Sequence, residues 1–186
     1  MHATVRAAMI VIAMGVCVSS QAQTINEYTV KRAPGAIKVD GKLDEAGWKN
    51  AASTVPFVIY TNGETPKFAT NAKMLWDDKY LYIAFIMTDN DVWAATKVWK
   101  VGDKCLCQEE VAEVFIDPDG DGQNYLEAEI NPYGALMSLR LDREFAKGGQ
   151  GDYSWSYKAM KIGTSVGGTL NNQSDTDTQW ICELGF

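Results

Sequence analysis

Strand-length segments dominate this chain and leave few folds open to it. Short runs that are apolar, or that alternate apolar with polar residues, recur about every 8–12 residues between turns rich in Gly, Asn and Asp. Few windows show the helical period. The expected strands are 72–76, 80–87, 111–117, 125–131, 135–141, 155–162 and 179–184. The pattern predicts an all-β fold, an antiparallel β-sandwich of the jelly-roll-like or immunoglobulin-like two-sheet type.

Two details refine this expectation. The segment 80–87, YLYIAFIM, is apolar on both faces, so we expect it in the centre of a sheet. The segment 43–48 predicts one short helical turn capped by Asp44. A chain of 186 residues suggests one domain, placed at 23–186. Because the sequence stops inside a strand-like segment at Phe186, we expect the C-terminal strands of the sandwich to be missing.

The first 22 residues resemble an export signal. One arginine precedes the apolar run 7–18, and small residues at Ser20 and Ala22 suit a cleavage site after Ala22. The run is shorter than the roughly 20 residues that span a bilayer, and no later stretch is long enough. The sequence therefore predicts a signal peptide at 1–22, no membrane span, and a location that is secreted, periplasmic or at the cell surface.

Charge and histidine content exclude several functions. Lys and Arg number 17 and Asp and Glu 24, giving a net charge of −7 without a basic run, which argues against nucleic acid as a partner. The single histidine, His2, falls in the predicted signal peptide. The mature chain then has no imidazole for a Ser-His or Cys-His pair, and neither haem nor zinc is expected.

Three cysteines remain after cleavage: Cys105, Cys107 and Cys182. In an oxidising compartment one disulfide and one free thiol is the simplest account, with Cys182 paired to either Cys105 or Cys107. Buried, unpaired thiols are an equally open alternative.

Acidic residues occur on strands where a core would not place them. In the segment 125–131, YLEAEIN, one face is apolar and the other carries two carboxylates and an amide. We expect one polar surface formed by Glu113, Glu127, Glu129 and Asn131. Carboxylates and amides bind vicinal sugar hydroxyls, and aromatic rings stack on the sugar ring. The alternative is an ordinary solvated sheet face.

Tryptophans and an acidic turn add two further expectations. Trp93, Trp99 and Trp155 lie in or beside loop-like segments and are expected to be exposed, whereas Trp48 and Trp76 are expected in the core. The turn 117–122, DPDGDG, spaces carboxylates as calcium ligands are spaced, which predicts a structural Ca²⁺ bound by Asp117, Asp119 and Asp121. A polar turn without metal is the alternative, because no bidentate Glu completes an EF-hand.

Five segments in order carry a family resemblance. They are VDGKLDEAGW (39–48), AKMLWDDKYLYI (72–83), Asp89, EVAEVFIDPD (110–119) and NYLEAEINP (124–132). Together they resemble the family 9 carbohydrate-binding modules and their DOMON-like relatives. The resemblance implies a non-catalytic β-sandwich that binds sugars, often beside a glycoside hydrolase domain, with structural calcium in some members.

The resemblance also bears on single residues. It implies a sugar contact for Glu113 and further polar contacts from Glu129 and Asn131. Members that clamp a sugar between two tryptophans carry one of them where this chain has Cys107, and the second would lie beyond Phe186. Trp99 is the substitute we expect for the first.

These observations predict a non-catalytic module that binds a polysaccharide or oligosaccharide of the plant type, in the xylan or cellulose class. Three alternatives stay open at this point. The first is a glycoside hydrolase that uses paired glutamates. The second is a DOMON-type relative that binds haem through methionine pairs or binds sugar. The third is an adhesion domain without a small ligand.

Overall fold

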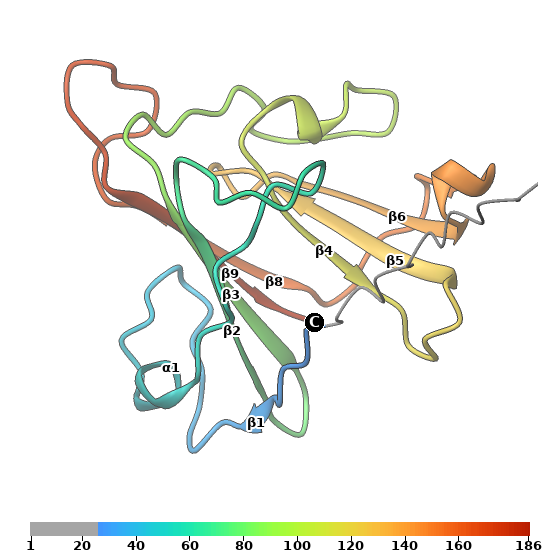
Figure 1. The fold of residues 1–186 in the computed structure, drawn as a ribbon, viewed down its shortest axis with the longest axis horizontal. Coiled ribbons are helices and arrows are strands. Elements are labelled where there is room, and N and C mark those ends of the chain that lie inside the picture. Colours follow the sequence, from blue (N-terminus) through green and yellow to red (C-terminus); the bar gives the residue numbers. More distant parts are fainter. Residues whose placement is uncertain (1–25) are drawn as a thin grey trace, which may run out of the picture.

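Alternating apolar side chains produce two β-sheets that pack face to face, as Figure 1 shows. The computed structural model describes residues 26–186, so the predicted signal peptide at 1–22 lies outside the described residues. The five-stranded sheet has the order β1 (Lys31–Arg32), β2 (Thr70–Trp76), β3 (Leu81–Thr88), β9 (Gln179–Gly185) and β8 (Lys161–Val166). The four-stranded sheet has the order β4 (Ala112–Ile116), β5 (Gln123–Ile130), β6 (Leu136–Arg143) and β7 (Gly151–Asp152).

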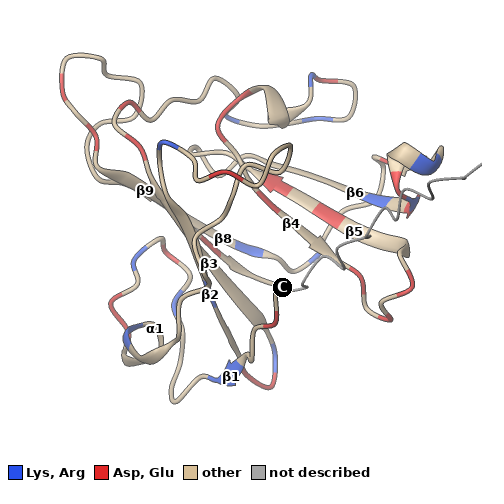
Figure 2. Ribbon diagram, viewed as in Figure 1, with Lys and Arg blue, Asp and Glu red and all other residues tan. Residues whose placement is uncertain are grey.

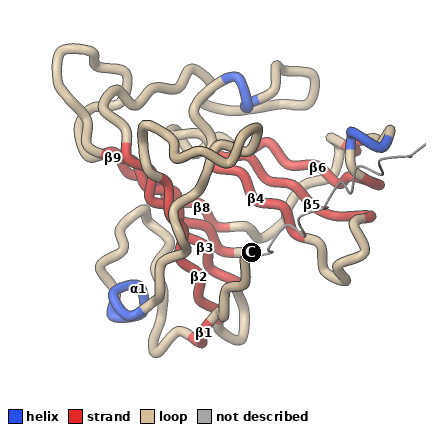
Figure 3. Tube along the Cα trace, viewed as in Figure 1, coloured by secondary structure: helices blue, strands red, loops and turns tan. Residues whose placement is uncertain are grey.

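The predicted two-sheet sandwich is confirmed. All pairings are antiparallel except that of β1 with β2, and β3, the doubly apolar segment, lies in the middle of its sheet. Figure 3 shows how little of the chain is helical: α1 (Ala46–Asn50) and the 3₁₀ turns η1 (Leu106–Gln108) and η2 (Phe145–Lys147). No helix within residues 26–186 is long and apolar enough to cross a membrane.

Two local predictions were wrong, and two short strands were missed. The expected strand 155–162 begins only at Lys161, because residues 155–160 are irregular, with a bend at 158–159. The two-residue strands β1 and β7 were not predicted, since two residues are too short to show a period. The helical turn begins at Ala46, after Glu45 and not Asp44, and no side chain caps it.

The apolar side chains gather in three layers. The layer between the sheets includes Phe85, Ile130 and Trp180, and a second layer packs the segment 33–51 on the outer face of the five-stranded sheet. A third layer lies on the outer face of the four-stranded sheet, where Leu106 of η1 packs on β6. Each fully buried Leu or Ile contributes roughly 1.5–3 kcal/mol. The third layer matters most for function, because it borders the predicted polar surface.

Trp48 and Trp76 were both expected in the core, and only one of them is there. Trp48 is fully buried, and its indole N–H donates to Glu183 Oε1 over 2.8 Å. Trp76 is 40% exposed at the end of β2, where the Arg32 guanidinium lies over its ring. The expectation for Trp76 was therefore wrong: the residue occupies the outermost position of its strand.

Candidate functional site

Three glutamates predicted to share a face do converge. Glu113 on β4 lies directly opposite Glu129 on β5, and Glu127 is two residues further along β5 on the same side. Each offers a carboxylate oxygen within 4.8 Å of those of the other two. The acidic positions on β4 and β5 are visible in Figure 2. We call Glu113, Glu127 and Glu129 the glutamate cluster.

Burial within the glutamate cluster is uneven. Glu113, on the edge strand, is exposed, whereas Glu127 and Glu129 are 6% and 2% exposed. Glu127 and Glu129 share a side-chain hydrogen bond, and the Cys107 backbone N–H also donates to Glu129. Among residues 26–186, no Lys or Arg pairs with any member of the cluster. Burial raises the pKa of all three carboxyl groups. Burial, with the charge of Glu113 adding to it, raises the pKa of Glu129 to about 8.

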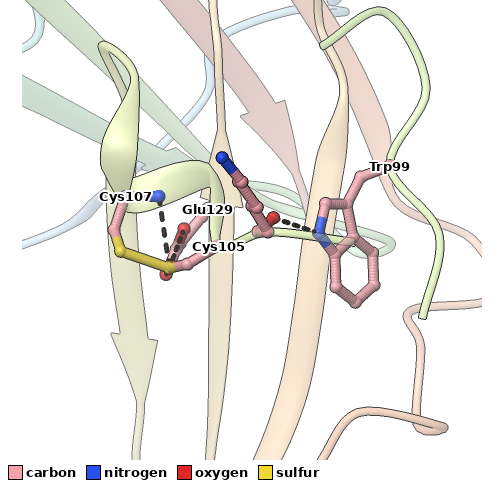
Figure 4. Close-up of a disulfide and its surroundings, with 5 residues drawn as sticks. Trp99, Cys105, Cys107 and Glu129 are labelled. Carbon is pink, nitrogen blue, oxygen red and sulfur yellow. Dashed lines mark hydrogen bonds between the residues drawn. A yellow bond between two sulfur atoms is a disulfide. The ribbon is translucent and has the colours of Figure 1, made fainter. Parts of the chain in front are cut away.

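A disulfide packs against the cluster, and it is not the one predicted. Cys105, which directly precedes η1, bonds to Cys107 within it, with their Cα atoms 5.2 Å apart. Cys182 is a free thiol fully buried between the sheets. The predicted pairing with Cys182 was wrong because β9 directs that side chain into the core. Both carboxylate oxygens of Glu129 lie 3.6 Å from the Cys105 sulfur, as Figure 4 shows.

A cavity of about 250 Å³ opens on the other side of this disulfide. Trp99 and Tyr153 contribute aromatic walls, Met137 and Cys105 an apolar floor, and Asp103 a carboxylate. The Trp99 indole N–H donates to the Lys104 carbonyl over 3.0 Å, which fixes the orientation of the ring (Figure 4). Met137 is the cross-strand partner of Glu129, so the cavity and the glutamate cluster lie on one sheet face.

Asn131, the fourth predicted member of the polar surface, is engaged within the protein. Its side chain is fully buried, donates to the Thr96 carbonyl and Glu109, and accepts from the N–H groups of Tyr133 and Ala135. All its hydrogen-bonding capacity is used. The structure therefore gives Asn131 a positioning role and leaves no group for a ligand.

The acidic turn 117–122 is closed by hydrogen bonds between its own residues. Asp117 accepts hydrogen bonds from the N–H groups of Gly120 and Gly122, which lower the pKa of its carboxyl group. One oxygen from each of Asp117, Asp119 and Asp121 lies within 4.8 Å of the others. Oxygen donors so arranged fit calcium, and calcium at this turn stays a prediction.

The other aromatic candidates lie elsewhere. Trp93 is 43% exposed, as expected, beside a separate surface hollow lined by Asp91 and Asn171. Trp155 is half-buried and stacks edge-on against Tyr157, with 4.5 Å between ring centroids. Sequence reasoning missed Tyr153 and Asp103, because both lie in irregular loops whose composition carries no signal.

Comparison with known proteins identifies the family. A family model described as "Carbohydrate family 9 binding domain-like" matches residues 39–141, more than half of the chain. The chain belongs to this family. The matched range of this family 9 domain contains both the glutamate cluster and Trp99.

Two curated relatives contain a similar domain. The chain is 30% identical over 133 residues to Exoglucanase XynX of Acetivibrio thermocellus, and 30% identical over 134 residues to Endo-1,4-beta-xylanase A of Thermoanaerobacterium saccharolyticum. Each match covers 71% of this chain. The family 9 domain corresponds to only 10% of the length of either relative.

Solved structures share the fold. Family 9 carbohydrate binding modules from Caldicellulosiruptor kristjanssonii in complex with cellotriose and with glucose match with TM-scores of 0.54 and 0.52. The matches cover 84% of this chain and 66% and 68% of those chains, at 16% and 15% identity. At this identity the likeness establishes the sandwich fold.

Proposed function

We propose that this family 9 domain binds plant-type polysaccharide of the cellulose or xylan class and acts as a non-catalytic targeting module. Family membership over residues 39–141 is the observation that carries the proposal. The solved relatives in complex with cellotriose and glucose, and the exoglucanase and xylanase relatives, support this class of ligand.

The Trp99 cavity is the binding site that we propose. The C–H face of a sugar ring packs on an aromatic side chain, and Trp99 and Tyr153 supply two such surfaces around one cavity. Sugar hydroxyls require polar partners at the rim. Asp103 supplies a carboxylate there, and Glu113 offers a second on the exposed edge of the same sheet face.

The wider context follows from the relatives. Because curated relatives named as glycoside hydrolases contain this domain as 10% of their length, we propose that it works beside a glycoside hydrolase domain. Export, expected from residues 1–22, agrees with polysaccharide as the ligand, since such polymers are degraded outside the cell.

Calorimetric titration with cellotriose and xylotriose tests the proposal. The wild-type domain is expected to release or absorb heat with at least one of them, and Trp99→Ala is expected to weaken binding by at least about tenfold, or about 1.4 kcal/mol. The loss follows from removing one aromatic wall of the cavity.

Trp93→Ala is the matched control, because it removes an exposed tryptophan from a different hollow. It is expected to bind like the wild type. Normal binding by Trp99→Ala together with a loss in Trp93→Ala would place the site elsewhere. Absence of heat with any glucan or xylan oligosaccharide would contradict the function itself.

A further inference from the structure

The Cys105–Cys107 disulfide places its two sulfur atoms in different surroundings. Cys107 is exposed, whereas Cys105 is half-buried and lines the Trp99 cavity. A thiolate opens a disulfide by attacking one sulfur while the other sulfur leaves, so the rate depends on access to the first and on stabilisation of the second. An external thiol therefore reaches the Cys107 sulfur, and the Cys105 sulfur is the one that leaves.

The free thiol of Cys182 provides a contrast. It is fully buried between the sheets, and burial raises its pKa above the ordinary value for cysteine. Because a thiol reacts as its thiolate, Cys182 is shielded both by packing and by its pKa. Within residues 26–186, the disulfide is thus the cysteine group that can react in the folded state.

Two groups contact the Cys105 sulfur, and both favour it as the leaving atom. The backbone N–H of Cys107 donates to it over 3.3 Å, and both carboxylate oxygens of Glu129 lie 3.6 Å from it, as Figure 4 shows. A hydrogen bond to an ionised acceptor is roughly twice as strong as one between neutral groups. The N–H group therefore stabilises a Cys105 thiolate more than it stabilises the disulfide sulfur.

Glu129 holds a proton that this thiolate can accept. Burial, the charge of Glu113 and the hydrogen bond shared with Glu127 raise the pKa of Glu129 to about 8, against a smaller opposing effect of the Cys107 N–H. The carboxyl group is therefore mostly protonated at pH 7. A free cysteine has a pKa of about 8.5, so transfer of this proton to the Cys105 sulfur costs little free energy.

We propose that Cys107 is a reversible thiol-modification site, at which an external thiolate attacks Sγ and opens the disulfide to Cys105. A new S–S bond joins the thiol to Cys107, the Cys105–Cys107 bond breaks, and its electron pair passes to the Cys105 sulfur. Glu129 protonates that sulfur, and the proton that the incoming thiol lost on ionisation returns to Glu129 through solvent. The product is a mixed disulfide at Cys107 and a free Cys105 thiol in the wall of the Trp99 cavity.

The mixed disulfide can react onward or back with thiols alone. A second external thiolate attacks its thiol-derived sulfur and releases Cys107, so that two external thiols are oxidised and the protein disulfide is reduced by two electrons. In the reverse direction, the Cys105 thiolate attacks the Cys107 sulfur, expels the first thiol and restores the starting disulfide. Neither route involves a sugar, so this site goes beyond the proposed function and does not depend on it.

Reduced glutathione is the probe for opening in the folded state. The native chain is incubated with it at pH 7, quenched with acid and digested for peptide mass spectrometry. The peptide containing Cys105 and Cys107 is expected to gain two hydrogens, or glutathione on Cys107, without denaturant, and oxidised glutathione is expected to reverse this. Reduction seen only after urea unfolds the protein would overturn the proposal, and so would attachment of glutathione to Cys105.

Two serine variants test which sulfur an external reagent reaches. Oxidised glutathione is expected to modify Cys107 in Cys105→Ser at least about tenfold faster than it modifies Cys105 in Cys107→Ser, because Cys107 is the exposed member of the pair. Cys182 is the internal control and is expected to stay unmodified in both folded variants. Equal rates at Cys105 and Cys107 would contradict the assignment.

Glu129→Gln tests the proton transfer. Glutamine has nearly the same shape as glutamate and is neutral, as Glu129 mostly is at pH 7, but it cannot give up a proton. The variant is expected to slow the opening of the disulfide by glutathione at pH 7 by at least about tenfold. Glu64→Gln, which alters an exposed carboxylate outside the site, is expected to open like the wild type. An unchanged rate in Glu129→Gln would show that Glu129 does not supply the proton.

Discussion

Glu110 shows how a single residue can couple stability to pH. One of its oxygens accepts the Trp93 N–H over 3.1 Å, and the other is buried without a partner among the described residues. Burial raises the pKa of Glu110 to about 7, opposed by the hydrogen bond from Trp93 and reinforced by Asp89, Asp91 and Asp177. The folded state therefore holds this proton more tightly than the unfolded chain.

The consequence is a loss of stability as the pH rises. The contribution of protonated Glu110 is fully present below the unfolded pKa of about 4.5 and disappears as the pH passes about 7. Glu110→Gln, which stays neutral, is expected to be more stable than the wild type at pH 8. Because solvent screens this partly exposed carboxyl group, the expected difference is about 1–2 kcal/mol, and it is expected to shrink toward pH 4.5. Urea unfolding at both pH values, in the presence of a chelator, measures it.

An exposed glutamate provides the comparison. Glu27→Gln is expected to show a difference from the wild type within about 0.5 kcal/mol at either pH. A Glu110→Gln advantage that is the same at pH 4.5 and pH 8 would show that the effect is not titration of this carboxyl group.

A site residue could be predicted from the sequence where its position depends only on the alternation within a strand. It could not be predicted where its burial or hydrogen bonds depend on segments distant in the sequence. Alternation along two strands is enough to bring Glu113, Glu127 and Glu129 together, because side chains of period two share a face. The burial of Glu127 and Glu129 could not be predicted, since it depends on η1 and its disulfide. Asn131 fits the same alternation, but its amide is engaged by a loop that lies distant in the sequence.

At the scale of elements, the long connection between β3 and β4 shapes the site. Figure 1 shows it crossing one end of the four-stranded sheet. Glu109 ties this connection together by accepting from the N–H groups of Ala95 and Thr96, from the Thr96 hydroxyl and from Asn131. The same connection carries Trp99 and the disulfide, so its attachment positions the cavity.

Asn131→Ala is expected to loosen this connection. It removes the donor to the Thr96 carbonyl and to Glu109, at a cost of about 1–3 kcal/mol for the groups left unpaired. Hydrogen exchange by mass spectrometry is expected to show faster exchange in residues 94–110 and little change in β3 and β9. The exposed Asn62→Ala is the control, and equal exchange in both variants would contradict the role of Asn131.

The long strands could be predicted from the sequence, and the two-residue strands could not. The segments that became β3, β5, β6 and β9 each show several alternating or apolar residues, so their pattern outweighs local noise. Strands β1 and β7 form only because neighbouring strands offer free backbone groups. The Cys105–Cys107 pairing depends on the local turn of η1, which the spacing of cysteines does not reveal.

The whole molecule is stabilised by three apolar layers, although a sandwich needs only one. The outer layer on the four-stranded sheet fully buries Leu106 and Leu141 and leaves Leu139 1% exposed, on the face where a solvated surface was one alternative. This layer shields part of the glutamate cluster from water. The stability of the domain and the composition of its site therefore depend on the same loop.

Leu139→Ala tests whether this layer is a true core. Deleting a buried leucine side chain is expected to cost about 2–5 kcal/mol through lost burial and a residual cavity. Phe115→Ala, on the same face but 55% exposed, is expected to cost under about 1 kcal/mol. Thermal and urea unfolding measure both, and similar costs for the two variants would show that the outer face is not packed as described.

The edge strand β1 of the five-stranded sheet affects whether two molecules can pair through their sheets at high concentration. Strand β1 consists of two exposed cationic residues, Lys31 and Arg32, and Arg32 is engaged by Asp78 and by the Trp76 ring. A short edge strand with charged side chains offers few free backbone N–H and C=O groups for pairing with a strand of a second molecule, and its positive charges repel the same strand of that molecule. Edge-to-edge pairing of two molecules through β1 is therefore disfavoured.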